Sequence, residues 1–213
     1  EAEFYTSGRT PNEAAFLYSI FVREFGTNNF PDCSNMCHEP TSRGLPAAIG
    51  VGKGTVVMED FDHAEAIFVI GQNTGTNSPR MMSNLFEARK RGVPIVAVNP
   101  MPERAFMRFT EPQDVIQMAT FGSTKIASEF VHIRIGGDLA LFKGMMKVMF
   151  EREAQGETII DHDFIAKHTA GFEAVREEAL THSWSEIVSV SGVSEEQIRR
   201  IAEIYMRSNA TMI

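Results

Sequence analysis

Short apolar runs alternate with longer amphipathic stretches over the first three quarters of the chain. The apolar runs predict strands over residues 66–70 (AIFVI) and 94–98 (PIVAV), with a shorter third strand over residues 131–135. A continuous apolar run of about five residues is typical of a strand that is buried on both faces. The amphipathic stretches predict helices over residues 11–25, 78–91 and 138–152. Strands that alternate with helices indicate an α/β fold, in which a parallel, dinucleotide-binding-like sheet is flanked by helices.

From about residue 161 onward only helical patterns remain, so the chain is predicted to end in a helical segment. Its clearest helix is expected over residues 194–208. Ser194 is the expected N-cap, and Gln197 follows three residues later, as in a capping box. Ser78, followed by Pro79, is likewise expected to cap the helix over residues 78–91.

Both ends of the chain look cut within an element. Residues 3–7 (EFYTS) suggest a strand with nothing before it, and residues 210–213 (ATMI) suggest a strand that stops in mid-run. We therefore expect a fragment of a larger multidomain protein. In this interpretation residues 1–30 are a partial strand and helix of a neighbouring domain, and residues 31–213 are the central α/β domain.

The charge of the chain limits its partners. With 28 acidic and 20 basic residues the formal net charge is −8, which disfavours a general affinity for nucleic acid or an anionic membrane. No apolar run approaches the roughly 18 residues that a membrane span needs. The two cysteines can form neither a disulfide framework nor, alone, a four-ligand metal site. We expect a cytoplasmic protein that binds a small molecule and no nucleic acid.

Three polar loops directly follow the predicted strands, at residues 71–78 (GQNTGTNS), 99–100 (NP) and 136–138 (GGD). Ligands of open α/β sheets lie beyond the carboxyl ends of the strands, where glycine lets the backbone approach them closely. Helix N-termini at the same edge favour phosphate. The loops therefore suggest a nucleotide or dinucleotide site, although ordinary Gly/Asn turns have the same composition. Neither G-x-G-x-x-G nor the P-loop pattern is present.

The loop over residues 32–40 (DCSNMCHEP) carries the most reactive side chains. A thiol beside an imidazole can be a nucleophile with its base, or a soft metal ligand with a proton acceptor. Buried structural groups would explain the same residues. The other histidines show no metal-ligand spacing and are expected at the surface or at helix caps.

Several motifs, in order along nearly the whole chain, resemble the molybdopterin oxidoreductase family. Residues 27–40 (TNNFPDCSNMCHEP) resemble its formate dehydrogenase alpha subunits and formate-dehydrogenase-like relatives, in which T-N-N leads to a selenocysteine or cysteine, then His, one residue and Pro. Further resemblances follow at residues 49–54, 62–73, 98–100, 134–141 and 164–173.

The resemblance implies a bis-molybdopterin guanine dinucleotide cofactor with molybdenum or tungsten. Cys37 would bind the metal through its thiolate, and His38 would accept or relay a proton. The implied reaction is a two-electron oxidation of formate or a similar small substrate, with an electron acceptor that stays unidentified. Any 4Fe-4S cluster of the parent protein would lie outside this segment, which is expected to be inactive alone. One dinucleotide would be lined by Gly71, Gln72, Asn73, Thr76, Asn77, Ser78, Asn99, Pro100, Glu103, Gly136, Gly137 and Asp138.

The chain departs from the family pattern at two positions. Glu39 follows His38 where formate dehydrogenases usually have Gly, so an anionic substrate would be repelled there. Ser78 stands where the dinucleotide loop often carries His. Cys33 is taken as structural. Two other interpretations remain: a thiamine-diphosphate-type central domain, and a non-catalytic degenerate relative that serves as a binding or stress-response module.

Overall fold

The computed structural model describes residues 2–6, 10–31 and 38–213. The chain divides into two compact units, residues 1–56 and residues 57–213. They are called the N-terminal and the C-terminal unit below, and each is described by itself. The boundary predicted at residues 30/31 concerns the domains of a larger protein and stays a prediction.

The N-terminal unit contains helices α1 (Asn12–Glu24) and α2 (Glu39–Ile49). Pro11 precedes α1 with a φ of −55°, close to the value that its ring imposes. The strand predicted over residues 3–7 is wrong for the described residues 2–6, which form no strand. Instead the ring of Phe4 packs edge-on against Tyr18, Phe21 and Phe25, and its N–H donates to the Asn29 carbonyl at 2.9 Å.

The C-terminal unit is built on four parallel strands in the order β3-β2-β1-β4. The pairing of β1 with β2 places Ile67 beside Ile95. The α/β fold with a parallel sheet is therefore confirmed. The strands are β1 (Ala66–Ile70), β2 (Ile95–Asn99), β3 (Glu129–His132) and β4 (Thr211–Met212).

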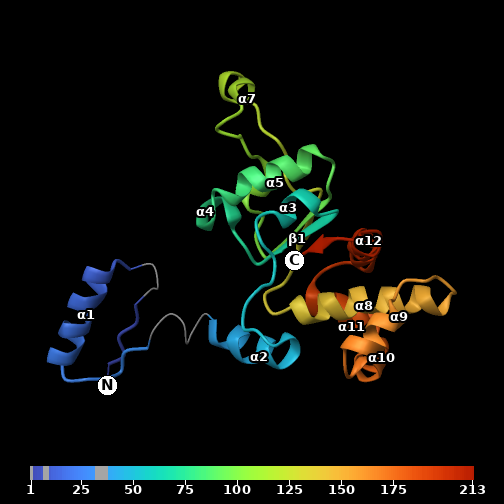
Figure 1. Cartoon of the computed structure of the whole chain (residues 1–213), viewed down its shortest axis with the longest axis horizontal. Coiled ribbons are helices and arrows are strands. Elements are labelled where there is room, and N and C mark those ends of the chain that lie inside the picture. Colours follow the sequence, from blue (N-terminus) through green and yellow to red (C-terminus); the bar gives the residue numbers. More distant parts are fainter. Residues whose placement is uncertain (1, 7–9, 32–37) are drawn as a thin grey trace. The chain divides into compact units, whose positions relative to one another are not determined.

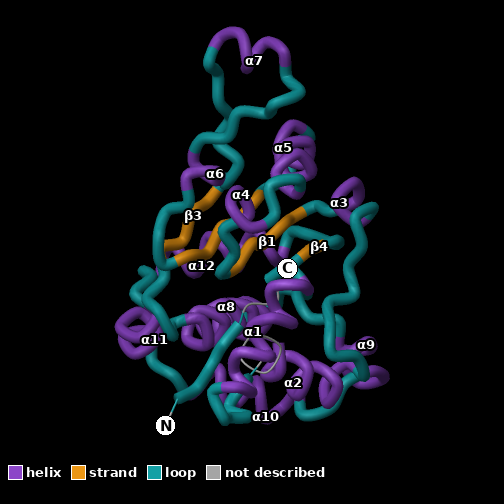
Figure 2. The backbone as a smooth tube through the Cα atoms, turned by 90° about the vertical axis from the view of Figure 1, so that its left-hand side faces the viewer, coloured by secondary structure: helices purple, strands orange, loops and turns teal. Residues whose placement is uncertain are grey.

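Helices cover both faces of this sheet (Figure 1; Figure 2). Alternate residues of β1 supply the two cores: Ile67 and Val69 face one layer, and Ala66 and Phe68 face the other. This explains the continuous apolar run. The first layer comprises α3 (Asp60–His63), α4 (Thr74–Asn77), α5 (Met81–Lys90) and α6 (Arg104–Met107). The second comprises α8 (Asp138–Ala154), α11 (Trp184–Ser191) and α12 (Glu195–Met206), with α9 (His162–His168) and α10 (Phe172–Thr181) in the same segment of the chain.

Two predicted boundaries move for identifiable reasons. The helix expected from Ser78 begins at Met81, because Ser78 already ends α4, whose first turn is capped by the Asn73 side chain. The third strand ends at His132 rather than at residue 135. Beyond it, the backbone N–H of Arg134 bonds to the Ser191 carbonyl at the end of α11 instead of to the sheet.

The cap predicted for α12 forms only in part. The Ser194 hydroxyl accepts the Gln197 N–H at 3.3 Å, as expected for an N-cap. The Gln197 side chain does not complete a capping box with Ser194 in this fully described part of the chain. It donates to the Glu129 carboxylate at 2.8 Å and to the Phe130 carbonyl at 2.9 Å, and so ties α12 to β3.

Helix α7 (Val115–Thr120) lies on a segment that projects from the rest of the C-terminal unit (Figure 1; Figure 2). The segment starts and ends at an antiparallel bridge between Phe109 and Thr124. Asp114 caps the helix by accepting the N–H groups of the second and third helical residues. The sequence analysis predicted no helix here. None of the helices in the described part of the chain is long and apolar enough to cross a membrane.

Candidate functional site

The strand order places the candidate loops at one edge of the sheet. The order β3-β2-β1-β4 reverses direction between β1 and β4, which is the topological switch point of a doubly wound sheet. Because all four strands are parallel, the loops after β1, β2 and β3 leave from the same edge. The predicted site residues at positions 71–78, 99–103 and 136–138 therefore share the edge at which such folds bind ligands.

Side-chain hydrogen bonds join the loop after β1 to the end of β2. The Asn99 side chain, which is only 3% exposed, donates to the Gln72 carbonyl at 3.2 Å. The Gln72 amide in turn donates to the Ser78 hydroxyl at 3.2 Å. Gly71 starts this loop with a φ of +68°, a conformation that glycine adopts without strain. These four predicted residues therefore form one connected group.

A pocket of about 450 Å³ opens beside the α4 turn, and it is called the α4 pocket below. Of the predicted residues it contains Asn73, Thr76 and Glu103. The oxygen of the Asn73 side chain accepts the Thr76 N–H at 3.2 Å, so that oxygen serves the turn. The complete lining is Asn73, Gly75, Thr76, Pro79, Met82, Glu103, Arg104, Ala105, Arg108 and Phe109.

Close packing between α4 and α6 fixes the shape of this pocket. A Cβ atom at Gly75 would lie 2.4 Å from the Cβ of Ala105, so only glycine allows the two turns to approach this closely. Phe106 is fully buried, and its carbonyl accepts the N–H groups of Ile126 and Ala127 at 3.0 Å. Glu103, directly before α6, is thereby held at the pocket.

The third loop, residues 136–138, contributes Gly136 to the lining of a different pocket of about 200 Å³. Its two glycines differ in their environment. A Cβ at Gly137 would lie 2.8 Å from the Ser191 Cα, so this glycine is required for packing against α11. Gly136 has a φ of +80° and open space around it. The His132 imidazole links the end of β3 to the loop after β2, because its Nε2 lies 2.6 Å from the Pro100 carbonyl oxygen.

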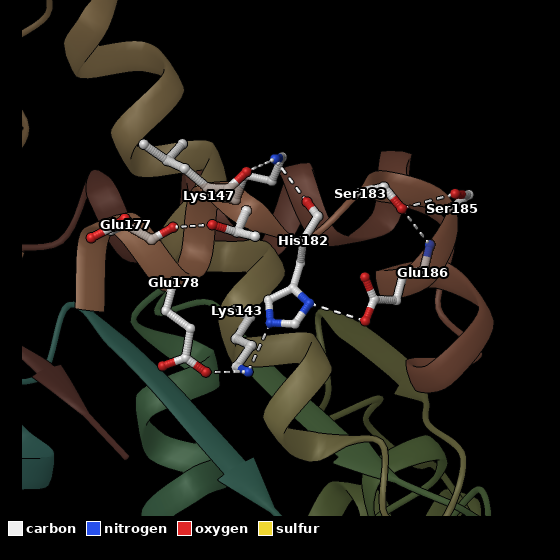
Figure 3. A network of polar contacts seen from close by, with 10 residues as sticks. Lys143, Lys147, Glu177, Glu178, His182, Ser183, Ser185 and Glu186 are labelled. Carbon is white, nitrogen blue, oxygen red and sulfur yellow. Dashed lines mark hydrogen bonds and ion pairs between the residues drawn. The ribbon is translucent and has the colours of Figure 1, made fainter. Parts of the chain in front are cut away.

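A polar network borders the 200 Å³ pocket and centres on His182 (Figure 3). The Lys143 ammonium lies 3.0 Å from His182 Nε2 and 2.6 Å from the Glu178 carboxylate, and it lowers the pKa of Glu178. His182 Nδ1 lies 3.0 Å from Glu186 Oε1. No sequence pattern indicated this network, because its members show no motif spacing and come from three separate helical segments.

Lys147 extends the network into the core (Figure 3). This residue is only 9% exposed. Its ammonium donates to the Leu180 and His182 carbonyls, each at 2.9 Å. It therefore satisfies carbonyl groups at the C-terminal end of α10 that have no partner within that helix. This arrangement holds α10 against α8.

The predicted metal ligand cannot be placed. Cys37 and Cys33 lie outside the described residues, so the role of the Cys37 thiolate stays a prediction. His38 is exposed and directly precedes α2. The Glu39 carboxylate accepts a hydrogen bond from Arg43 Nε at 3.2 Å. Across residues 2–6, 10–31 and 38–213, no three His, Cys, Asp or Glu side chains gather as a metal site.

The edge of the sheet fits the nucleotide part of the expected cofactor. At Gly71 and Gly136 nothing lies within 4 Å of the position of a Cβ, so a ligand can approach the backbone. Thr76 and Asn77 are exposed beside them. A pocket of about 450 Å³ suits one nucleotide rather than a whole pterin dinucleotide. The residues therefore fit a ligand that extends along the edge beyond the α4 pocket.

Comparison with known proteins identifies relatives of the chain, although no family model matches it. Protein YdeP of Escherichia coli is 50% identical over 218 residues, covering all of the chain and 29% of YdeP. The uncharacterized oxidoreductase Rv2900c of Mycobacterium tuberculosis is 46% identical over 213 residues, covering all of the chain and 27% of that protein. The F420-dependent formate dehydrogenase 1 subunit alpha of Methanococcus maripaludis is 28% identical over 214 residues, covering all of the chain and 28% of that subunit.

A solved structure shares the fold. Acetylene hydratase from Pelobacter acetylenicus matches with a TM-score of 0.66 at 20% identity, covering 90% of the chain and 23% of that protein. The chain spans less than a third of the length of the relatives reported above. Its homologues include formate dehydrogenase subunits and uncharacterized oxidoreductases, so the resemblance inferred from the motifs is confirmed.

Proposed function

Because this chain belongs with the oxidoreductases that include the formate dehydrogenase subunits, we propose that it is the dinucleotide-binding segment of a molybdopterin-dependent oxidoreductase. In this proposal residues 31–213 form the central domain. The whole protein oxidises formate or a similar small substrate, and its electron acceptor is not identified. One guanine dinucleotide of the cofactor lies along the carboxyl edge of the sheet.

One observation carries the proposal. The end of β2 and the loops after β1, β2 and β3 carry all twelve predicted dinucleotide residues at one edge of the sheet, and the loop after β1 lies beside the switch point. In particular, Gln72, Ser78 and Asn99 form one hydrogen-bonded group. Because loops that follow parallel strands share one edge by topology, the specific support for a ligand site is the open space beside Gly71 and Gly136 together with this hydrogen-bonded group.

The metal centre would be held by residues before α2. A bound pterin–metal cofactor supplies the two-electron redox chemistry, which no side chain of the protein can perform alone. The Cys37 thiolate is a soft ligand that suits such a metal. In this proposal the adjacent His38 imidazole holds or relays a proton at a ring nitrogen.

Glu39 influences which substrate the protein takes. A carboxylate beside His38 disfavours a second anion, but the Arg43 guanidinium pairs with that carboxylate at 3.2 Å. The pair lowers the net negative charge at this position. Because this pair is exposed, it offsets only part of the repulsion, so the proposal includes neutral molecules of similar size as substrates beside formate.

The metal content of the full-length protein tests the proposal. We expect Cys37→Ala to lose molybdenum or tungsten and all turnover, because the thiolate ligand is gone. Cys33→Ala, the matched control, should keep both metal and activity. The measurements are elemental analysis, pterin fluorescence after oxidation, and formate-dependent dye reduction.

Two outcomes would contradict the proposal. If Cys37→Ala retains full metal content and turnover, the thiolate is not the ligand. If the wild-type full-length protein folds without metal or pterin, the non-catalytic binding module becomes the better interpretation. The isolated chain of 213 residues should show no dye reduction in either case.

A further inference from the structure

Arg104 and Arg108 lie one helical turn apart and share two neighbouring pockets. Arg104 begins α6 and Arg108 follows its last residue. Both line the α4 pocket, and both also line a pocket of about 310 Å³ at the base of the α7 segment. This second pocket is called the α7 pocket. Its other lining residues are Thr110, Gln117, Met118, Phe121 and Ser123.

Neither arginine has a carboxylate partner within the described part of the chain. Among the described residues, Arg108 makes one long side-chain contact, 3.4 Å from its Nε to the Ser123 hydroxyl. The chain as a whole is acidic, with a net charge of −8. Two guanidinium groups one turn apart repel each other unless an anion lies between them.

The backbone that carries the two arginines is rigid. Phe106, between them in sequence, is fully buried, and its carbonyl accepts two N–H groups from residues 126 and 127. The close contact between Gly75 and Ala105 fixes the same turn from the other side. The positions of the two Cα atoms are therefore fixed before a ligand binds, and only the side chains have to be ordered.

The α7 pocket offers the chemistry of an oxyanion site. Its lining contains hydroxyl and amide groups from Thr110, Gln117 and Ser123, and no carboxylate. Phe121, also in the lining, is the only described non-glycine residue with positive φ, at +55°. This conformation ends α7 at the rim of the pocket. The guanidinium fork matches phosphate oxygens in two-point contacts.

We propose that Arg104 and Arg108 form a phosphate-binding site at the junction of the α4 and α7 pockets. The phosphoryl group can come from two sources. One is a nucleotide whose base lies in the α4 pocket, and this alternative rests on the proposed function. The other is free phosphate, which needs no nucleotide at the edge of the sheet.

Calorimetric titration of the full 213-residue chain with inorganic phosphate at constant ionic strength tests the site. We expect the dissociation constant for phosphate to rise about tenfold or more in Arg104→Gln/Arg108→Gln, because charge-assisted hydrogen bonds are lost. The matched control, Arg23→Gln/Arg176→Gln, removes the same charge from α1 and α10 and should bind as the wild type does. Arg104→Lys/Arg108→Lys, which keeps the charge without the fork, should bind with intermediate affinity.

Both arginines are exposed, so the variants should fold, and circular dichroism checks this directly. Absence of phosphate binding to the wild type would overturn the site. Equal loss of phosphate affinity in Arg104→Gln/Arg108→Gln and in the control double variant would overturn it as well. Titration with guanosine monophosphate and guanosine separates the sources. Tighter binding of the monophosphate than of phosphate, with competition by guanosine, supports the nucleotide source, whereas equal binding supports free phosphate.

The monophosphate also separates failure of this site from failure of the proposed function. If it binds the wild type and Arg104→Gln/Arg108→Gln equally, the arginine site is refuted while a nucleotide edge remains. Absence of metal and pterin from the wild-type full-length protein would instead refute the proposed function. Phosphate binding by the two arginines would be unaffected by that result.

Discussion

The two helical layers of the C-terminal unit differ in their arginines, since the α3–α6 layer holds both a paired one, Arg91 with Asp62, and two without a carboxylate partner in the described chain. In the layer of α8, α11 and α12, Arg152 pairs with Glu157 and Glu203, and Arg199 pairs with Glu151. In the layer of α4 and α6, Arg104 and Arg108 border pockets without a carboxylate partner in the described chain. Paired charges hold helices together, whereas unpaired charges at a cavity remain available to a ligand.

The glycines of the loops divide in the same manner. Gly75 and Gly137 have no room for a Cβ, so packing alone accounts for them. Gly71 and Gly136 have open space around them and positive φ. A glycine in a candidate binding loop is therefore informative about a ligand only when the neighbouring chain does not already require it.

The largest effect is expected at the contact between α4 and α6. Gly75→Ala places a Cβ 2.4 Å from the Cβ of Ala105, and we expect it to lower the free energy of unfolding by about 3 kcal/mol through overpacking. Phosphate binding should weaken as well, because the arginine-bearing turn shifts. Urea unfolding followed by circular dichroism measures the change.

A second variant makes this test specific. Gly75→Ala combined with Ala105→Gly removes the colliding methyl group and should recover most of the lost stability. If the double variant is no more stable than Gly75→Ala, the contact between the two turns is not the cause.

A smaller effect is expected in the opposite layer, at the buried Lys147. Lys147→Met leaves two carbonyl groups at the end of α10 without their donor, which should cost about 1–2 kcal/mol of unfolding free energy. The exposed Lys167→Met on α9 is the matched control and should be neutral. Phosphate binding should not change in either variant. Weakened phosphate binding in Lys147→Met would mean that the two layers are not independent.

The smallest effect concerns the pH dependence of the Lys143–Glu178 pair. The Lys143 ammonium lowers the pKa of Glu178 below its ordinary value of 4.5. Because the pKa of Glu178 is lower in the folded than in the unfolded protein, its ionised carboxylate stabilises the fold at pH values above the ordinary pKa. This contribution is lost as the pH falls through the lowered pKa. The difference in thermal midpoint between wild type and Glu178→Gln should therefore be present at neutral pH and vanish in acid.

Glu173→Gln serves as the control for this experiment, because the Glu173 carboxylate lies 4.0 Å from Arg176 in a highly exposed pair. Exposed pairs of this kind contribute little to stability. A difference between wild type and Glu178→Gln that persists unchanged at acidic pH would show that Glu178 acts through packing rather than charge.

Local sequence was sufficient for the elements that depend on local burial. The continuous apolar runs located β1 and β2 to within one residue, because strands buried on both faces leave no other pattern. The helix after Gly137 was located equally well at its start. Residues of the candidate site could be predicted where they follow strand ends, since parallel strands bring those loops together.

Tertiary contacts decided the rest. The end of β3 depends on a backbone bond from Arg134 to Ser191, far away in sequence, and no local pattern reports it. The arginine site depends on a pocket that exists only because the α7 segment folds back through Phe109 and Thr124. Two arginines four residues apart soon after a strand end were the only signal that could have indicated it.

Strand β4 imposes an order on folding. It pairs with β1 through Thr211 and Met212, at the opposite end of the C-terminal unit in sequence. During synthesis β1, β2 and β3 can therefore associate while one apolar face of the sheet still awaits α11 and α12. Such late, non-local closure slows folding and leaves an aggregation-prone intermediate, so production of the protein should benefit from low temperature and chaperones.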